Sequence, residues 1–412
     1  MITTNAKKVQ LLAPAGNFEK LEIAVHYGAD AVYLAGKAFS LRNFSENFTL
    51  DEIESAVKYA HQQDVKVYVA CNIYARNAEL KKIAGYLKAL KTIGPDAVII
   101  ADPGVFMAAG SLMKQIPVHL STQANTTNYQ SARFWESLGV QRINVSRELS
   151  LNEIKKIARH CSLEIEAFVH GAMCISYSGR CLLSNFLAGR SGNLGSCTQS
   201  CRWKYFLVEE FRPGQYLPFS EDDRGSYIFN SRDLCMIEHI PAMIQSGVNA
   251  LKIEGRMKGI NYLAATVKVY REAIDAYYDN PGGYRVKKEW IEELERITHR
   301  GYCTGFYLGT PGPQSMQYKF KNKAGHTFIG KVIKSARPFY ADIDVRNKIF
   351  KGDEVEVLMQ KGPARQDKII DMFDEFGQPL GFAQPGSRVT VALHHDYAAN
   401  DLIRRADNNV VL

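Results

Sequence analysis

Residues 9–36 read VQLLAPAGNFEKLEIAVHYGADAVYLAG, and this stretch holds one complete repeat of the pattern that decides the fold. Its apolar ends, 9–15 and 31–36, predict two short buried strands, because aliphatic runs of this length are typical of parallel sheets. Between them, apolar residues three or four apart predict an amphipathic helix that ends near Gly28, a residue type suited to helix C-caps. The stretch therefore predicts a strand–helix–strand unit.

The same unit recurs along most of the chain. Six more apolar runs predict strands at 66–72, 97–102, 118–123, 142–148, 165–171 and 250–255. Helical spacing alternates with them at 50–62, 80–94, 104–115, 128–138, 150–160, 234–246 and 260–279. Eight strands in strict alternation with eight helices predict an α/β fold, a (β/α)8 TIM-like barrel. A doubly wound open sheet is the alternative, and the lack of a glycine-rich dinucleotide fingerprint after the first strand disfavours it.

The pattern changes toward the end of the chain. A short helix is expected at 288–299, and the Pro- and Gly-rich segment GTPGPQSMQYKFKNKAGH predicts a linker over 311–327. After it, five segments of alternating polarity predict antiparallel strands: FIGKVIK, YADIDVRNK, DEVEVLM, DKIIDMFDE and SRVTVAL. We therefore predict a barrel over 1–310 and a small all-β domain, an antiparallel barrel or sandwich, over 328–412.

Composition and charge narrow the class of protein. The 412 residues are 46% hydrophobic and 23% charged, as in soluble globular proteins. We expect a cytoplasmic protein, because neither a secretory signal nor a membrane span of roughly 18 apolar residues occurs. The net charge is +8, and residues 251–324 carry 13 basic against 8 acidic residues. Such a face would attract a polyanion such as RNA, and an ordinary solvated surface is the alternative.

Five of the eight cysteines lie between residues 166 and 235. They are Cys174, Cys181, Cys197, Cys201 and Cys235. Their spacings are C-x6-C, C-x15-C, C-x3-C and C-x33-C, and none of these is the C-x2-C pair of a zinc ribbon. In a reducing compartment, thiols grouped among glycines favour a metal or iron–sulfur site over simple buried packing. Spacing alone leaves zinc and iron–sulfur both open.

The predicted barrel indicates where in the fold these cysteines lie. Active sites of TIM barrels lie at the carboxyl ends of the strands. The cysteine-rich insert, 172–233, leaves from the end of the seventh strand, so we expect it to lie across that mouth. Cys235 is expected to return at the start of the seventh helix. A cluster held there would lie near the reacting groups.

The seventh predicted strand carries two acid–base candidates. Strand alternation puts Glu166, Phe168 and His170 on one face, so Glu166 would lie deep in the barrel and His170 near its mouth. His170 is either a catalytic or ligating histidine at that place, or a hydrogen-bonded structural one. We predict catalytic roles for Glu166 and His170.

Polar residues at the other strand ends complete the candidate site. Glu254 follows the last barrel strand and is the third catalytic candidate. Arg147 and Arg256 would bind a small anion as a pair, or would close the rim of the barrel through salt bridges. Asn72 and Gln123 end two further strands and are expected to contact the substrate.

The segment from Glu166 to Ser184 reads E-x-F-x-x-G-A-M-C-x4-G-x-C-x-L-S. Together with the opening of the chain, CRWKYFLVEE, NSRDLCMIEHIP and LKIEGRMK, it resembles the collagenase-like peptidases of unassigned catalytic type, family thirty-two. The resemblance covers most of the chain. It implies a 4Fe–4S cluster, because related members carry one on four cysteines whose spacing best matches Cys174, Cys181, Cys197 and Cys235.

The resemblance also implies an activity. The most similar subgroup of the family is linked to tRNA hydroxylation, which forms 5-hydroxyuridine at the wobble position and requires prephenate. The tRNA anticodon arm would then be the partner, held by the basic residues of 251–324 and by the C-terminal domain. The two carboxylates of prephenate would pair with Arg147 and Arg256. An electron donor or a homologous partner protein is expected as well.

Two other functions compete with this one. The family name implies a collagenase-like peptidase that uses a metal or a thiol, although neither an HExxH nor a GxSxG motif occurs. A binding or maturation module with a purely structural cluster is the third hypothesis. Iron and sulfide content, peptide cleavage and tRNA nucleosides distinguish the three.

Overall fold

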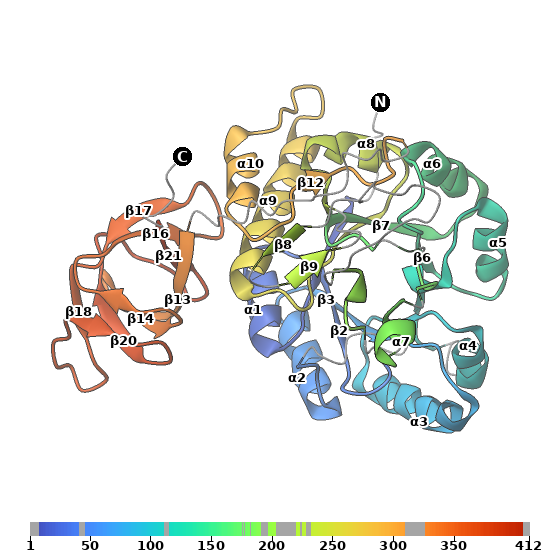
Figure 1. Ribbon diagram of the computed structural model, residues 1–412, viewed down its shortest axis with the longest axis horizontal. Coiled ribbons are helices and arrows are strands. Elements are labelled where there is room, and N and C mark those ends of the chain that lie inside the picture. Colours follow the sequence, from blue (N-terminus) through green and yellow to red (C-terminus); the bar gives the residue numbers. More distant parts are fainter. Residues whose placement is uncertain are drawn as a thin grey trace, which may run out of the picture.

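The chain forms two parts in the computed structural model, a barrel ringed by helices and a separate β domain (Figure 1). The structure describes residues 8–40, 46–110, 115–174, 176, 178–181, 183–190, 197–202, 220–222, 225–227, 232–309 and 326–406. Nearly all of the predicted linker, 311–327, and about half of the predicted insert, 172–233, lie outside those residues.

Eight parallel strands close the barrel. Strand β11 pairs with β7 on one side and with β1 on the other, so the sheet returns to its first strand. The barrel strands are β1 (Gln10–Pro14), β2 (Ala31–Ala35), β3 (Lys66–Cys71), β4 (Ala97–Ile100), β5 (Val118–Leu120), β6 (Arg142–Asn144), β7 (Glu164–Gly171) and β11 (Ala250–Ile253). The predicted (β/α)8 architecture is confirmed, and the open-sheet alternative is wrong.

Helices cover the outer face of the barrel (Figure 1). They are α1 (Phe18–His26), α2 (Leu50–His61), α3 (Asn77–Ile93), α4 (Pro103–Ala109), α5 (Tyr129–Ser137), α6 (Leu151–His160), α8 (Ile240–Gln245), α9 (Ile260–Asp279) and α10 (Lys288–Glu295). Capping boxes begin two of them, where Thr49 pairs with Glu52 and Ser150 with Glu153. Gly94 ends α3 with a φ of 78°, as its sequence position predicts. Among the described helices, none is both long and apolar enough to cross a membrane.

The segment predicted as a helix over 234–246 is the main error of the sequence-based prediction in the barrel. It begins with strand β10 (Asp233–Cys235), which is antiparallel to β7, and becomes α-helical only at α8, after a 3-10 turn at Ile237–His239. Strand β12 (Tyr302–Cys303) pairs with β10, and Arg300 Nε donates to the carboxylate of the first β10 residue at 3.0 Å. Tertiary pairing therefore overrides the helical spacing. The predicted ligand Cys235 ends a strand and does not start a helix.

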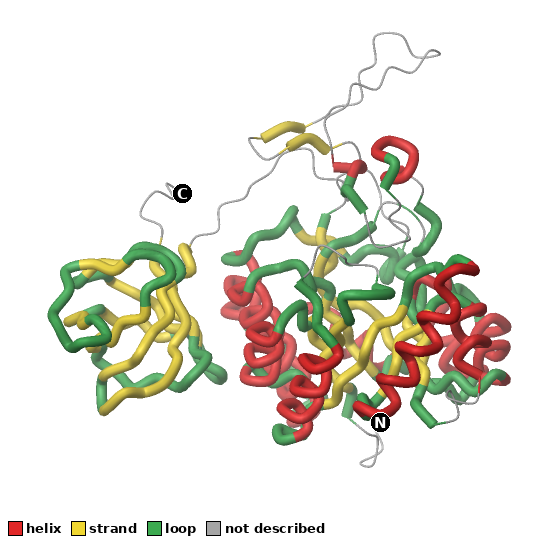
Figure 2. The backbone as a smooth tube through the Cα atoms, turned by 90° about the horizontal axis from the view of Figure 1, so that it is seen from below, coloured by secondary structure: helices red, strands yellow, loops and turns green. Residues whose placement is uncertain are grey.

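The described pieces of the insert lie at one end of the barrel. They include α7 (Leu183–Ala188), β8 (Ser220–Asp222) and β9 (Gly225–Tyr227). Figure 2 shows them beyond one end of the barrel. Nearer the barrel, the Ser178 backbone N–H donates to Glu148 Oε1 at 3.1 Å, and the Ser178 hydroxyl lies 3.3 Å from that of Thr122. This part of the insert therefore lies over the carboxyl ends of the strands.

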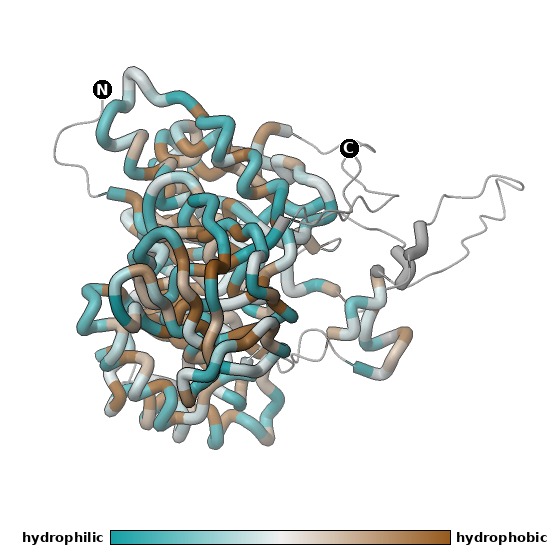
Figure 3. The backbone as a smooth tube through the Cα atoms, turned by 90° about the vertical axis from the view of Figure 1, so that its left-hand side faces the viewer, coloured by the Kyte–Doolittle hydropathy of each residue, from teal (hydrophilic) through white to brown (hydrophobic). Residues whose placement is uncertain are grey.

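An antiparallel sheet forms the C-terminal domain. Its strand order is β17-β16-β21-β13-β14-β20-β18. Its strands are β13 (His326–Arg337), β14 (Tyr340–Val345), β16 (Glu354–Leu358), β17 (Arg365–Lys368), β18 (Asp371–Phe373), β20 (Arg388–Ala392) and β21 (Leu402–Ala406), and β15 (Ile349–Phe350) pairs separately with β19 (Phe382–Ala383). Hydrophobic and hydrophilic residues alternate along these strands (Figure 3). The all-β prediction is confirmed, but DKIIDMFDE, predicted as one strand, contributes to both β17 and β18.

Buried polar contacts hold the β domain against the barrel helices. Arg404 is fully buried and donates to Glu293 of α10 and to Glu356 of β16, both at 2.6 Å. The Tyr27 hydroxyl, at the end of α1, donates to the Leu358 carbonyl at 2.6 Å. Because these groups are satisfied only across the contact, separating the two parts would expose or orphan them.

Candidate functional site

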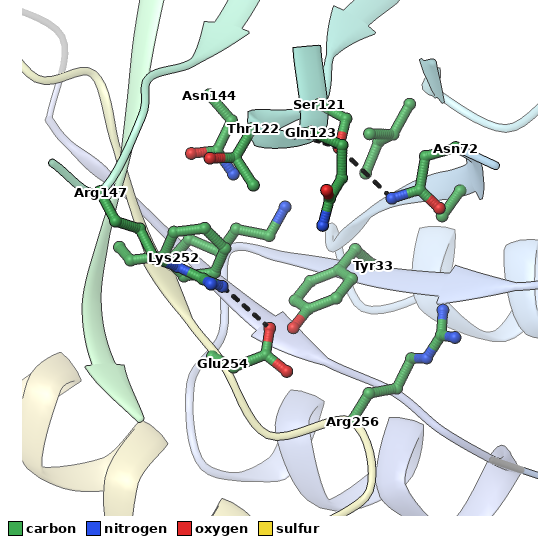
Figure 4. A pocket seen from close by; sticks show the side chains of 13 residues that line it. Tyr33, Asn72, Ser121, Thr122, Gln123, Asn144, Arg147, Lys252, Glu254 and Arg256 are labelled. Atoms are coloured by element: carbon green, nitrogen blue, oxygen red, sulfur yellow. Dashed lines mark hydrogen bonds and ion pairs between the residues drawn. The ribbon is translucent and has the colours of Figure 1, made fainter. Parts of the chain in front are cut away.

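A polar pocket opens at the carboxyl ends of the barrel strands (Figure 4). Its inner space, measured for the centre of a water-sized sphere, is about 60 Å³, so the pocket is narrow and opens toward solvent. Seven barrel strands or the turns that follow them line it, with Tyr33, Ala70, Asn72, Ile99, Ser121, Thr122, Gln123, Asn144, Arg147, Phe168, Lys252, Glu254 and Arg256. A pocket at this end of a TIM barrel is the expected place for substrate.

Two arginines bring positive charge to the pocket. The Arg147 guanidinium lies 4.1 Å from the centre of the Phe168 ring, and its Nη2 lies 3.8 Å from Glu254 Oε2. Arg256 is 4% exposed and donates to Ser40 Oγ at 3.3 Å. Figure 4 shows the two arginines on opposite sides of the drawn pocket. Ring stacking and burial hold both guanidinium groups in place, so they can bind an anion without being ordered first.

Amides and hydroxyls form another wall of the pocket (Figure 4). Asn72 Nδ2 donates to Ser121 Oγ at 3.3 Å, which fixes the orientation of that amide. The Oδ1 atoms of Asn72 and Asn144 are buried and have no hydrogen-bond partner among the described residues. Asn144 is only 3% exposed. An unsatisfied buried acceptor costs about 1–3 kcal/mol, so these two oxygens mark where N–H or O–H groups of a ligand would bind.

Paired charges form the floor beneath the pocket. Lys252 Nζ lies 2.8 Å from Glu166 Oε1, and Arg142 Nη1 lies 3.6 Å from Glu166 Oε2. Arg142 also donates from Nε to Glu164 at 2.9 Å. Glu166 is 2% exposed and Lys252 is 5% exposed, so this network lies within the barrel. It neutralises charges that would be costly to bury singly.

A buried histidine adjoins this floor. The His119 ring lies 4.5 Å from the Tyr68 ring, centre to centre. Burial, reinforced by the nearby cations Arg142 and Lys252, holds the pKa of His119 well below its usual value. The ring is therefore neutral at neutral pH, and the floor carries no third cation.

Five of the seven predicted catalytic and substrate-binding residues line the pocket. The five that line it are Asn72, Gln123, Arg147, Glu254 and Arg256. Glu166 faces the barrel interior as predicted, one layer below the lining, where it binds Lys252. The catalytic candidate nearest the space for a ligand is therefore Glu254.

His170 lies outside the described lining of the pocket. It is 1% exposed, and its ring centre lies 5.3 to 5.8 Å from the rings of Tyr302, Tyr270 and Tyr262. Burial lowers its pKa to about 3. The prediction that it shares a face with Glu166 is wrong, because a bulge skips one residue of β7 and pairs His170 with the outward-facing Ile253.

Several lining residues escaped the sequence-based prediction. Lys252 and Asn144 are strand residues, whereas that prediction considered mainly the residues that follow each strand. Tyr33, which also belongs to a strand, lies under the Lys252 ammonium at 4.4 Å. A signal was present, because Lys252 precedes the inward-facing Glu254 by two residues and alternation places both on one face.

The predicted cluster ligands lie above and beside the end of β7. Cys174 is exposed and lies three residues beyond that strand, and Cys235 pairs with His170 in the β10–β7 ladder. Burial raises the pKa of the Cys235 thiol to about 11. Cys181 and Cys197 are partly buried in the insert. Within the described ranges, no group of three or more His, Cys, Asp or Glu side chains is arranged to hold a metal ion.

Two family models match the chain. The model of peptidase family U32 matches residues 16–317, and the model of the peptidase family U32 C-terminal domain matches residues 324–404. The first match covers the barrel from α1 onward, the insert and α10, and the second covers nearly all of the β domain. The first match ends and the second begins inside the segment predicted as a linker, 311–327.

Named relatives align with most of the chain. The tRNA hydroxylation protein P1 of Bacillus subtilis is 41% identical over 380 residues, which cover 92% of this chain and 90% of the relative. The tRNA hydroxylation protein P of Escherichia coli is 37% identical over 397 residues, with 86% and 87% covered. A protein of Methanocaldococcus jannaschii described as an uncharacterized protease is 36% identical over 415 residues, with 98% of each chain covered.

Proposed function

The chain belongs to peptidase family U32, and because relatives named tRNA hydroxylation proteins match most of its length, we propose that it hydroxylates tRNA. The observation that supports this function best is the pocket at the barrel mouth. Its two arginines suit anionic groups, and the unpartnered oxygens of Asn72 and Asn144 suit the N–H groups of a base edge. An unstacked base can enter such a pocket.

The product in this proposal is 5-hydroxyuridine at the wobble position. The wobble base lies in the anticodon loop, where it can reach the pocket without the opening of a duplex. Prephenate binds in the same mouth, with its carboxylates paired to Arg147 and Arg256. The burial of Arg256 and the stacking of Arg147 on Phe168 support this assignment, because both guanidinium groups are already ordered.

Glu254 is the acid–base group of the proposal. Its carboxylate lines the pocket, whereas Glu166 is engaged with Lys252 below it and His170 lies within a tyrosine cluster. With oxygen taken from water, conversion of a ring C–H to C–OH releases two protons and two electrons, and an electron acceptor must take up the two electrons. A carboxylate within the pocket can accept one of these protons.

A 4Fe–4S cluster is the redox centre that we propose. Thiolates are the usual ligands of such clusters, and no disulfide joins Cys174, Cys181, Cys197 or Cys235 among the described residues. The described side chains do not form an assembled metal site, and about half of the insert lies outside them. The assignment therefore rests on the donor set, and no reaction step is derived through the cluster.

Nucleoside analysis of tRNA tests the activity. A strain that lacks the chain should lose 5-hydroxyuridine from its tRNA, and the wild-type chain should restore it. The Arg147→Ala and Glu254→Ala chains should restore about 10-fold less or worse, because each removes a group that contacts the substrate. Unchanged nucleosides in the deletion strain would contradict the proposed function.

Iron and sulfide assays on anaerobically purified protein test the cofactor. We expect about four irons and four sulfides per chain, lost on replacement of any predicted ligand by Ala. Cys161→Ala is the matched control, because that thiol lies beyond α6 and outside the insert. Zinc in place of iron would remove the redox centre from the proposal.

A peptidase is the second candidate, on the strength of the family name alone. The described lining of the pocket contains neither cysteine nor histidine, so a thiol or histidine-metal peptidase site is not found there. Cleavage of collagen-like peptides by the pure protein would reverse this ranking.

A further inference from the structure

Two exposed phenylalanines and a lysine form a distinct surface group on the β domain. Phe350 is 42% exposed and Phe382 is 48% exposed, and their ring centres lie 6.3 Å apart across the β15–β19 ladder. Lys348 Nζ lies 4.9 Å from the first ring centre and 4.5 Å from the second. We call these three residues the phenylalanine platform.

The exposure of this platform is not explained by the fold. Burial of a phenylalanine side chain contributes about 1.5–3 kcal/mol, and the β domain has a core of its own in which such rings could pack. Single exposed apolar residues are ordinary on a protein surface. Here, by contrast, two rings from paired strands share one ammonium, and paired exposed rings of this kind are typical of binding surfaces.

An ion pair places the residue just before the platform near the level of the barrel mouth. Helix α1 follows β1 directly, so Glu19 in its first turn lies at the level where the barrel strands end. Arg346 of the β domain pairs with Glu19, and it precedes Lys348 by only two residues. At the other end of α1, His26 Nε2 lies 3.0 Å from Asp401. The β domain therefore lies along α1, with Arg346, two residues before the platform, at the end of α1 nearest the mouth.

The chemistry of the platform selects its occupant. Nucleobases stack on exposed aromatic rings, and a cation beside those rings attracts the adjacent phosphates. Protein interfaces are enriched in aromatic residues but depleted in lysine, so the central ammonium favours RNA over a protein partner. We propose that the phenylalanine platform stacks an unpaired nucleotide of the RNA whose target base enters the barrel pocket. This inference rests on the proposed tRNA hydroxylation.

Two contacts of this kind would divide recognition between the two parts of the chain. The pocket would bind the base that reacts, and the platform would bind a neighbouring unpaired nucleotide without reading its sequence. A single-stranded loop can span both sites, whereas a continuous duplex offers no free base to stack. The β domain would thus favour loops over helices as substrates.

Binding of a fluorescent anticodon stem–loop RNA, measured by anisotropy at one fixed salt concentration, tests the platform. The F350A/F382A double variant should bind about 5-fold to 100-fold more weakly, because one stacked base is worth about 1–3 kcal/mol. Phe382→Trp should retain the affinity, since a larger ring still stacks. Lys348→Gln should weaken binding less and should lower its salt dependence.

Phe376→Ala is the matched control. Phe376 is an 80% exposed phenylalanine of the same domain that lies in the turn after β18, and its loss should change the affinity less than 2-fold. Thermal unfolding of each variant shows whether the domain is intact. If the double variant binds the RNA as tightly as the wild type, this inference is wrong and the proposed function still stands. If the wild-type chain does not bind the RNA, both are wrong. If the double variant loses a protein partner but keeps its affinity for the RNA, the platform is a surface for protein docking.

Discussion

Depth inside the barrel separates two kinds of polar residue. On the floor, Glu166 binds Lys252 and Arg142, and all three side chains are almost fully buried. At the mouth, Asn72 and Asn144 keep buried oxygens that no described residue binds. The charges of the floor are therefore balanced within the fold, although Glu166 Oε2 and His119 Nδ1 also lack a hydrogen-bond partner among the described residues, whereas the unpartnered oxygens of the mouth belong to residues that line the pocket.

Strand register produces this division. Strand β6 places Arg142 on the floor and Asn144, two residues later, in the lining of the pocket. The last barrel strand places Lys252, which binds Glu166 and also lines the pocket, two residues before Glu254. Because inward-facing residues recur every second position, one step of about 6–7 Å along a strand changes a residue from structural to ligand-binding. Variants on the floor should therefore lower the free energy of unfolding more than variants at the mouth.

Removal of the central floor carboxylate should have the largest effect. Glu166→Ala leaves Lys252 and Arg142 buried near each other without their shared partner, and breaking a buried ion pair in this way costs about 3–5 kcal/mol. Urea unfolding followed by circular dichroism measures the loss. We expect a lower midpoint with an unchanged slope.

Glu164→Ala is the control for that variant. Glu164 binds the same Arg142 from the same strand, but its side chain is 39% exposed. Exposed ion pairs contribute less than about 1 kcal/mol, so this variant should be nearly as stable as the wild type. Equal losses for both glutamates would show that burial does not distinguish the floor.

Acid should weaken the floor through His119. Its pKa is lowered in the fold by burial and by Arg142 and Lys252, so the unfolded chain binds the proton more readily. The stability from this histidine is therefore complete above its unfolded pKa of about 6.5 and is lost as the pH falls below that value. Between pH 7 and pH 5 we expect a loss of about 1–2 kcal/mol.

The His119→Gln variant isolates this contribution. His170, whose pKa is lowered to about 3, shifts stability in the same direction but is present in both proteins and cancels from the comparison. Urea midpoints measured from pH 7 to pH 5 should fall more steeply for the wild type than for the variant. Parallel curves would show that the cations of the floor do not keep His119 neutral.

The sequence predicted the mouth better than the floor. Asn72, Gln123, Arg147, Glu254 and Arg256 all follow from the rule that polar residues at strand ends line a barrel mouth, and all five line the pocket. Glu166 was placed inward by alternation alone, and its partners Lys252 and Arg142 come from other strands. Pairing across strands depends on closure of the barrel, which one strand read by itself does not encode.

Local irregularities account for the remaining errors. The bulge beside Ile253 turns His170 outward, and no residue in the β7 sequence signals it. Likewise, the helical spacing of 234–246 is overridden in β10 by pairing with β7 and β12. Both departures come from contacts between segments far apart in the chain, so periodicity within a segment could not reveal them.

The smallest effect on stability, with a large effect on function, is expected at the mouth. Asn144→Ala removes an acceptor that the fold leaves unpartnered, so the free energy of unfolding should change by less than about 1 kcal/mol. The 5-hydroxyuridine in tRNA should fall about 10-fold, because a hydrogen bond to the bound base is lost.

Asn249→Ala reverses the two effects. Asn249 precedes β11 at the opposite end of the barrel, and its Oδ1 accepts the Ile165 N–H at 2.7 Å. Its loss should cost about 1 kcal/mol of stability and leave the tRNA nucleosides unchanged. If Asn144→Ala destabilised the chain as Asn249→Ala does and kept full hydroxylation, the unpartnered oxygen at the mouth would be structural. The proposed division between a charge-balanced floor and a ligand-binding mouth would then be wrong.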